Sequence, residues 1–257
     1  MERPADSPTS NSADIAGDVS AGHGKPNAAR PKPGNKLSTA VLCVWNDIDR
    51  EIENEYEPWY QWEHLPDRVD LPGFRSCRRY VRTRGEGRQY FTFSDLDAIE
   101  VLTSAGYLDR LREPPDWTRR IMPHFRRAIR LTAKVWTDRG DGTGGFMGVA
   151  LFEGLDEQRR TAIRAALTGC LDEVMKDARV TRIRVLEEYA AGTGVPNPEA
   201  ALRPDPPKTA ELAILAEGSF ETAVSDHLAR ITALTDLAAL VPTMPPSIYR
   251  LLYSSRS

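Results

Sequence analysis

The residues best suited to chemistry gather in one short segment, WYQWEHLPDR at positions 59–68. It holds His64, one of four histidines in the chain, between two acids at Glu63 and Asp67. A neutral imidazole can take a proton near neutral pH, and a neighbouring carboxylate can orient it or stabilise its charge. On a helix Tyr60 shares a face with His64, because residues four positions apart are neighbours. His64 is therefore the leading candidate for an acid or base, with Tyr60 beside it.

Two other roles are open for His64. Near the C-terminus of a helix its ring could satisfy free backbone carbonyls instead of taking part in a reaction. It could also bind a metal ion, but no second histidine or cysteine stands at ligand spacing, so we predict no metal site. The other histidines are weaker candidates. His124 could ligate a heme iron but has no attachment motif beside it, and His23 and His227 are expected to be inert or to face solvent.

Aromatic and basic side chains in the same half of the chain could complete such a site. Trp59 and Trp62 would shape a pocket for a flat substrate. Arg78 would steady a developing oxyanion and is the third catalytic candidate after His64 and Tyr60. Alternatively, the arginines could sit at sheet ends and reach water. The further substrate-binding candidates are Tyr80, Tyr90 and Arg130.

Composition excludes several classes of protein. The net charge of −3 gives no basic field for nucleic acid. No apolar run approaches the roughly 20 residues of a membrane span, and the N-terminus does not resemble a secretion signal. The three cysteines form no Cys-x-x-Cys pair. No Gly-x-Gly-x-x-Gly opens a helix after a strand. We therefore expect a cytoplasmic protein with no membrane, nucleic-acid or cofactor partner.

The elements that must position these residues follow one order twice. Residues 1–36 are rich in small and polar residues and are predicted to be a disordered tail. A first unit, 37–137, has Asp47 as a helix cap and Pro58 as a helix interruption. Its expected elements are a strand at 40–45, a helix at 48–62, strands at 74–82 and 89–94, a helix at 95–105 with an irregular extension, and a strand at 128–136.

A glycine-rich linker, 138–145, is followed by a second unit, 146–257. Its expected elements are a strand at 146–152, a helix at 156–176, a strand at 181–189, a loop at 191–207, a strand at 210–217, a helix at 220–234 and a strand at 247–254. The two units share element order but hardly any sequence. We read the second as a degenerate unit without a counterpart of the Glu-His-Leu-Pro motif.

The order β-α-β-β-α-β is the ferredoxin-like split motif, whose helices cover one face of a four-stranded sheet. The bare faces of two such units can cover each other. We therefore predict an α+β fold in which two ferredoxin-like units pack sheet to sheet as an intramolecular α/β barrel. From the strand alternation we expect the apolar set to face the helices and the polar set to face the second sheet or solvent. These sets are Cys77, Val81, Phe91, Phe93, Ile129, Leu131, Ala133 and Val135 against Ser76, Arg78, Tyr80, Tyr90, Thr92, Ser94, Arg130, Thr132, Lys134 and Trp136.

The first unit also resembles a known superfamily. The residues that carry the resemblance are Trp59-Tyr60, Glu63-His64-Leu65-Pro66, Arg68, Pro72-Gly73-Phe74, Arg79-Tyr80 and the later segment VLTSAGY at 101–107. They resemble the dimeric α/β-barrel superfamily, especially its EthD-like branch. The resemblance covers about 38–136, whereas 146–254 match only in element order. It implies a group that includes cofactor-free monooxygenases, cyclases, isomerases and decarboxylases, heme-dependent enzymes and proteins without known activity.

Together the residues and the resemblance predict a cofactor-independent enzyme. Its substrate would be a small apolar molecule, of aromatic or polyketide-like type, bound between sheet and helices. The corner of the chain that carries His64 would open onto the hollow inside the barrel. The reaction would be driven by proton transfer, as in isomerisation, cyclisation, decarboxylation or oxygen insertion. The alternatives are a non-catalytic ligand-binding or stress-response module and, more weakly, a heme enzyme. Ordinary members of the superfamily carry one unit and pair, so this chain is expected as a monomer with an internal pseudo-dimer or as a homodimer.

Overall fold

The structure is a computed structural model that describes residues 38–190 and 197–256. The predicted tail and the first part of the predicted 191–207 loop lie outside these residues. The strands of the first half are β1 (Ala40–Ile48), β2 (Phe74–Arg84), β3 (Tyr90–Leu96) and β4 (Phe125–Gly140). Its helices are α1 (Glu53–Trp59), α2 (Leu65–Val69), α3 (Ala105–Arg112) and α4 (Asp116–Ile121), with a π-helical turn at Tyr60–His64 and 3-10 turns at Arg50–Ile52, Ile99–Thr103 and Met122–His124.

The second half repeats this order with a simpler set of helices. Its strands are β5 (Phe146–Glu153), β6 (Val180–Glu188), β7 (Leu212–Gly218) and β8 (Val241–Arg256). Its helices are α5 (Glu157–Val174), α7 (Glu221–Thr232) and α8 (Thr235–Ala238), with a 3-10 turn at Ala200–Leu202. The long helix α5 is capped by the side chain of Asp156, which accepts from the backbone N–H of Arg159, and it buries Ile163, Leu167, Leu171 and Val174.

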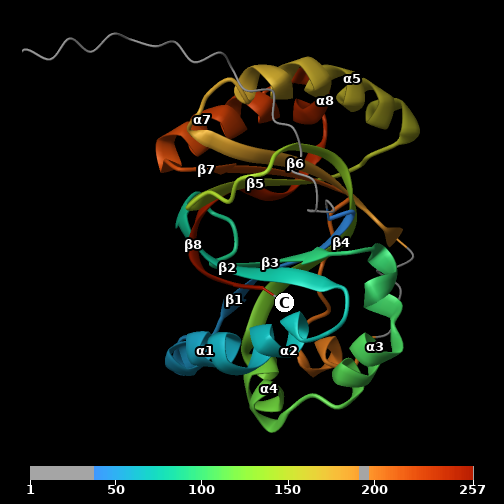
Figure 1. Cartoon of the computed structure of the whole chain (residues 1–257), viewed down its shortest axis with the longest axis vertical. Coiled ribbons are helices and arrows are strands. Elements are labelled where there is room, and N and C mark those ends of the chain that lie inside the picture. Colours follow the sequence, from blue (N-terminus) through green and yellow to red (C-terminus); the bar gives the residue numbers. More distant parts are fainter. Residues whose placement is uncertain (1–37, 191–196, 257) are drawn as a thin grey trace, which may run out of the picture.

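The strands form one closed barrel in the order β1-β3-β2-β8-β5-β7-β6-β4, and every pairing is antiparallel. Each half contributes one sheet of four strands. Numbered along its own half of the chain, the strands lie across each sheet in the order fourth, first, third, second. The pairings β2–β8 and β4–β6 join the two sheets. Helices α5, α7 and α8 cover one side and α1 to α4 the other, with the strands between them (Figure 1). The predicted fold of two ferredoxin-like units packed sheet to sheet is confirmed.

The two halves also share a detail of strand pairing. In the first half the β2–β3 register shifts between Phe74 and Ser76, so that Ser76 pairs with Asp95. In the second half the β6–β7 register shifts between Val180 and Arg182, so that Arg182 pairs with Glu217. A bulge twists its strand and re-aims side chains. The same irregularity therefore places Asp95 and Glu217 in equivalent positions.

Three apolar clusters hold these layers together. One lies between the first sheet and its helices, one fills the barrel, and one lies between the second sheet and its helices. Inside the barrel, Trp45 stacks on Phe91 with ring centroids 4.5 Å apart. Burial of this much apolar surface is the main stabilising term of such a fold.

The predicted strand faces are right for β2 and wrong for β3 and β4. Cys77 and Val81 belong to the cluster under the helices, as expected. The apolar residues of β3 and β4 instead fill the barrel, and their polar neighbours lie on the helix side. The residues in reversed positions include Phe91, Phe93, Ile129, Leu131 and Ala133. The reason is that the barrel interior is closed off from solvent at this level, so it takes the most apolar face of each strand.

Several predicted boundaries are also wrong. Asp47 does not cap a helix, because β1 continues through it and its carboxylate binds Arg127. The predicted helix at 95–105 is the end of β3 followed by a 3-10 turn. Strand β4 runs to Gly140, three residues into the predicted 138–145 linker, and β8 begins at Val241, before the predicted 247. Both long strands bend across the seam between the two sheets, where pairing with a second neighbour extends them.

Candidate active site

The Glu-His-Leu-Pro segment contains a π-helical turn. The backbone N–H of Leu65 donates to the carbonyl of Tyr60, five residues back. Pro66 follows at once, and a proline has no N–H for the carbonyl four residues earlier and crowds it with its ring. We attribute the widened turn to Pro66. Such turns are rare in proteins, and those that occur are often found at functional sites. The alternative in which His64 caps a helix end is wrong, because the chain continues directly into α2.

The turn brings three aromatic rings together. The ring centroid of His64 lies 4.4 Å from that of Trp59 and 5.1 Å from that of Tyr60. The imidazole makes no hydrogen bond to any described residue. Burial lowers the pKa of His64, and the positive charge of Arg68 lowers it further, to about 3. The ring is therefore neutral near pH 7, with a free nitrogen to accept a proton.

The two acids that flank His64 in sequence do not orient it. Oε1 of Glu63 accepts from Trp59 Nε1 at 3.0 Å, and from the backbone N–H and hydroxyl of Thr118 at 3.0 and 2.9 Å. Asp67 lies 3.5 Å from Arg110 Nη1. A helix points neighbouring residues in different directions, so adjacency in sequence is a poor guide to contact. The carboxylate that acts on His64 is Glu199, which works to raise the imidazole pKa.

His64 lines a small chamber of about 40 Å³ between the first sheet and its helices. Arg68 forms a buried ion pair with Glu199, which belongs to the β6–β7 connection of the second half. Arg203, from the same connection, lies over the ring of Phe125, with its guanidinium carbon 4.8 Å from the centroid. The remaining lining residues are Leu42, Val44, Tyr60, Leu65, Cys77, Thr92, Ser94, Tyr107, Leu111, Arg130 and Asn197. The site of the first half is thus completed by the second.

A larger cavity of about 500 Å³ adjoins this chamber. Arg130, Asn197 and Arg203 line both spaces. They therefore mark the neck between the chamber and the outer cavity. The outer cavity is also lined by Ala200, Ala201, Pro204, Pro206, Pro207, Lys208 and Thr209.

Arg78 and Tyr80 lie on the opposite face of the sheet from His64, inside the barrel. Arg78 is 3% exposed and binds Glu217 at 2.8 Å and Asp95 at 3.3 Å. Arg184 binds the same two carboxylates at 2.9 and 2.6 Å. These four residues, the interior quartet, pair their charges with each other, while Nε of Arg78 and Nε of Arg184 have no acceptor among the described residues. The prediction that Arg78 and Tyr80 act together with His64 therefore does not match their positions.

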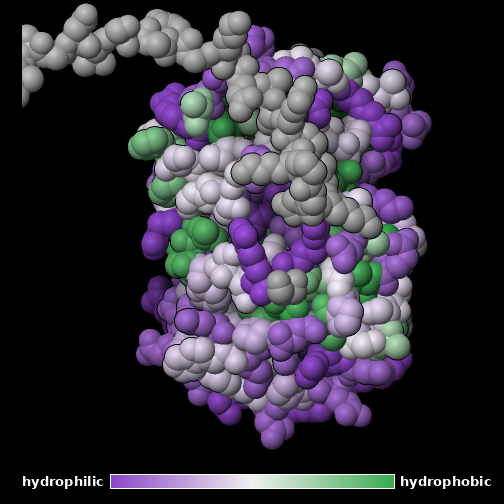
Figure 2. Space-filling view, viewed as in Figure 1, coloured by the Kyte–Doolittle hydropathy of each residue, from purple (hydrophilic) through white to green (hydrophobic). Residues whose placement is uncertain are grey.

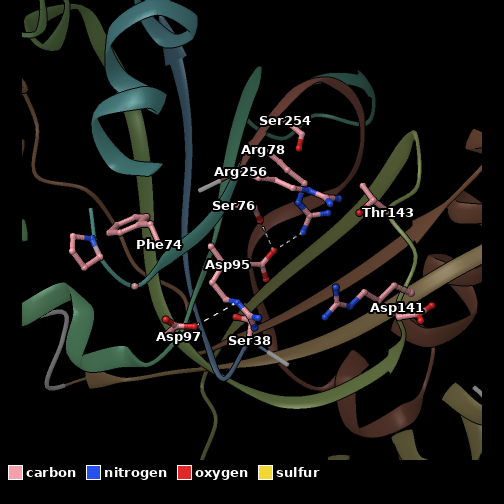
Figure 3. Close-up of a pocket in the computed structure, with 14 residues that line it drawn as sticks. Ser38, Phe74, Ser76, Arg78, Asp95, Asp97, Asp141, Thr143, Ser254 and Arg256 are labelled. Carbon is pink, nitrogen blue, oxygen red and sulfur yellow. Dashed lines mark hydrogen bonds and ion pairs between the residues drawn. The ribbon is translucent and has the colours of Figure 1, made fainter. Parts of the chain in front are cut away.

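The quartet borders a second cavity, of about 540 Å³, at one end of the barrel. Figure 3 shows Arg78 and Asp95 pointing toward one another, with Ser76 also bonded to Asp95. Thr143, Ser254 and Arg256 lie around the same space. The lining carries acids as well as arginines, among them Asp97 and Asp141. Its lining holds four arginines and three aspartates, and it shares no residue with the His64 chamber.

Some of the other predicted site residues lie at the chamber, and others lie away from it. Trp59 and Tyr60 pack against His64, and Arg130 lies at the neck. Tyr90 is on the same side of the sheet but donates to Glu53 at 3.1 Å and does not line the chamber. Trp62 is 70% exposed and points away from the site. Sequence reasoning missed Glu199 and Arg203, whose segment offered only prolines and glycines as a signal.

The remaining described histidines have other partners. His124 Nδ1 lies 3.2 Å from Asp49 Oδ2 and 3.2 Å from Glu51 Oε1, and these three offer ligand atoms within 4.8 Å of one another. Arg126 binds the same oxygen of Asp49 at 2.5 Å, so this surface group is a network of ion pairs. His227 lies 2.9 Å from Asp177. Cys43, Cys77 and Cys170 are free cysteines.

The comparisons with known proteins find likeness in structure only. No family model matches the chain, and no curated protein matches it. An anthrone oxidase-like protein aligns at TM-score 0.61 and 11% identity, over 86% of this chain and 94% of that one. A candidate monooxygenase from Fusobacterium nucleatum aligns at 0.53 and 5%, over 86% and 95%. A chlorite dismutase from Candidatus Nitrospira defluvii aligns at 0.53 and 10%, over 85% and 93%.

These neighbours are ferredoxin-like proteins of the dimeric α/β-barrel type, and this chain shares that fold. The match extends over both halves of the chain and over nearly the whole of each neighbour. At such low identity the likeness is one of fold, and a fold hosts many activities.

The chamber beside His64 is too small to hold a heme. A chamber of about 40 Å³ beside His64 is far below the roughly 300–1,000 Å³ of pockets that hold drug-sized ligands, and a heme is at least such a ligand.

The outer surface adds little to the site. Among the described residues no helix combines the length and apolarity of a membrane span. The surface over α1 and α4 is mostly hydrophilic (Figure 2) and includes the exposed pair Arg120–Glu55. The features that point to chemistry are therefore concentrated at the His64 chamber.

Proposed function

We propose that this protein is an enzyme that removes a proton from a small, largely apolar molecule of aromatic or polyketide-like type. The observation that carries the proposal is a neutral, unbonded imidazole at the wall of a chamber that joins a cavity of about 500 Å³. A mostly apolar pocket with a few convergent polar groups is the usual form of a small-molecule site. We place the protein with the EthD-like enzymes on the resemblance of its Glu-His-Leu-Pro segment.

The two spaces divide the substrate between them. The outer cavity has room for the body of the molecule, which would lie on its alanines and prolines, while Lys208, Thr209 and the neck residues form the rest of the wall. The inner chamber has room for a small group only, because a single water needs about 10–15 Å³ measured in the same way. A carbonyl or phenolic end that enters the neck would bring its neighbouring C–H or O–H bond to His64.

The charges around the chamber favour ionisation of the substrate. When His64 takes the proton, the electron pair of the broken C–H or O–H bond stays on the substrate as an enolate or phenolate. Arg68 and Arg203 lie close enough to lower the pKa of His64, and their positive charges would stabilise the enolate or phenolate. The anion in turn would raise the pKa of His64, because it offsets the same arginines. Isomerisation, cyclisation and decarboxylation can follow from this step without a cofactor. Oxygen insertion can follow when O2 oxidises the anion, with one oxygen atom entering the product and the other leaving as water.

The test is turnover of a panel of phenolic and polycyclic aromatic compounds in air, followed by mass spectrometry. His64→Asn should abolish conversion, because asparagine cannot accept a proton. The matched control is His227→Asn, on α7 in the other half of the molecule, which should convert at the wild-type rate. Full activity of His64→Asn would refute the role of His64.

A second function is favoured by the low pKa of His64, since a base with a pKa of about 3 is weak. In this alternative the protein binds the same ligands without converting them. The panel separates the two functions. Compounds that remain bound and unchanged after incubation would support the binding module, whereas new masses that depend on His64 would support the enzyme.

We also infer that the chain acts as a monomer. The bare face of each sheet is already covered by the other sheet, so no second chain is needed to bury it. Sedimentation equilibrium should give a mass close to 28.7 kDa. A mass of twice that value across micromolar concentrations would contradict the inference.

A further inference from the structure

The His64 chamber holds more positive than negative charge. Its lining contains the guanidinium groups of Arg68, Arg130 and Arg203 and one carboxylate, that of Glu199. Glu199 is committed to Arg68, with which it forms a buried ion pair. The neutral ring of His64 adds no compensating charge. Two of the three guanidinium groups therefore lack a carboxylate partner within the chamber.

Arg203 carries the clearest sign of a missing partner. Its Nε and Nη1 atoms are buried and have no hydrogen-bond acceptor among the described residues. Nη1 of Arg68, a residue only 6% exposed, is in the same condition. Burying an ionised donor without an acceptor costs free energy. A ligand that enters the chamber can supply the missing acceptor.

The position of Arg203 also suits recognition of a ligand. It lies at the neck, on the face of Phe125, and Arg130 lies at the same neck. Burial lowers the pKa of Arg203, Glu199 raises it, and the positive charge of Arg130 lowers it again. Two like charges held near each other at an opening attract an anion that can contact both. A carboxylate has two oxygens for this purpose and suits guanidinium geometry.

We propose that the site recognises a small organic carboxylate, and that Arg203, supplied by the second half of the chain, is its recognition residue together with Arg130 at the neck. The apolar body of the ligand lies against the prolines and alanines of the outer cavity. The inference rests on the proposed function only in that both place the ligand in the same chamber. It assigns the second half a direct part in specificity.

The first test is calorimetric titration of the whole chain with two pairs of compounds, benzoate with benzamide and 1-naphthoate with 1-naphthamide. Each pair has matched shape and differs in charge. At least one acid should bind ten or more times more tightly than its amide. Equal affinity within both pairs, or no binding of either acid, would overturn the proposal.

The second test assigns the recognition to Arg203. Arg203→Gln should weaken binding of the acid at least tenfold and leave the amide unaffected. The matched control is Arg230→Gln, an exposed arginine on α7, which should bind like the wild type. Wild-type affinity of Arg203→Gln for the acid would show that another group reads the charge.

A third measurement needs no ligand and separates recognition from structure. Arg203→Met keeps the stem that packs on Phe125 and removes the charge. If Arg203 is kept for a ligand, the unfolding midpoint of this variant in anion-free buffer should equal or exceed that of the wild type. A fall of several degrees would assign Arg203 a structural role. If the Arg203 variants fail to fold, two measurements still decide the proposal. They are the preference of the wild type for the acid over its amide and the affinity of Arg130→Gln for the acid.

The outcome is independent of the proposed enzyme activity. His64→Asn should still bind the acid, since the imidazole is not the charged partner. Retained binding with lost turnover supports both proposals. If the protein binds the acid but converts no compound of the panel, it is a carboxylate-binding module. The proposed recognition by Arg203 then holds although the proposed reaction does not.

Discussion

At the scale of single residues, His64 links stability to pH. Its folded-state pKa of about 3 lies below the 6.5 of an unperturbed histidine, so the unfolded chain takes up the proton first. The stabilising effect of keeping the ring neutral is complete above pH 6.5 and is lost progressively as the pH falls toward about 3. In this window the folded protein should lose at most about 1.4 kcal/mol per pH unit through this group.

The measurement is denaturant unfolding of the wild type and of His64→Asn at pH 7 and pH 5. The variant lacks the titrating group, so the wild type should lose up to about 2 kcal/mol more than the variant over this interval. Comparing the change within each protein removes any fixed packing difference. Parallel losses in both proteins would mean that His64 is not held neutral by its surroundings.

The sequence identified part of this site and could not have identified the rest. His64, Tyr60 and Trp59 were found because one short helical segment carries all three. Arg68 was present in the same motif, but its partner Glu199 lies 131 positions away in the chain. No periodicity links residues so distant, and the segment around Arg203 offered only turn-forming residues. Contacts between a loop and a remote helix form only when the barrel closes, so they cannot be read from the order of residues in the chain.

At the scale of elements, Glu63 fixes the turn that presents His64. Its carboxylate joins the π-helical turn to α4 through Trp59 and Thr118. Glu63→Gln keeps the shape but removes the charge and replaces one acceptor oxygen by a donor amide. We expect a loss of about 1–3 kcal/mol in the free energy of unfolding, because the oxygen that accepts all three hydrogen bonds becomes a neutral amide oxygen, a weaker acceptor than a carboxylate oxygen.

The matched control is Glu55→Gln, which also breaks a link between this helical region and α4, through Arg120. Both partners are exposed, at 43% and 55% of their side-chain surface, so the expected loss is below about 1 kcal/mol. Chemical denaturation of the two variants provides the comparison. Equal losses would show that the Glu63 contacts do not hold the turn.

The same scale shows why strand faces were harder to predict than strand order. Strands and turns were recognisable from alternation and from glycine and proline. In β3 and β4, however, both faces are covered, one by helices and one by the opposite sheet. A strand covered on both sides has no solvent face to mark its orientation. The apolar face went to the barrel, where polar groups such as those of the interior quartet must pair.

At the scale of the whole molecule, the quartet reveals the internal symmetry that the sequence hides. Arg78 and Arg184 occupy equivalent positions on β2 and β6, and Asp95 and Glu217 equivalent positions on β3 and β7. Each arginine binds both carboxylates, so the four charges join the two halves across the barrel. The halves differ at the His64 segment but match at this junction.

The quartet should therefore behave as one unit. Arg184→Met leaves two buried carboxylates with a single arginine, and we expect a loss of about 3–5 kcal/mol. Adding Glu217→Met removes one surplus charge, so the double variant should lose less than the sum of the two single variants, by about 1–3 kcal/mol. The matched control is the exposed pair Arg139 and Asp172, where the same substitutions should cost little and add within about 0.5 kcal/mol. Denaturant unfolding of each single and double variant measures both cycles. Simple additivity in the quartet would mean that its ion pairs act separately, and that the junction between the halves rests on apolar packing.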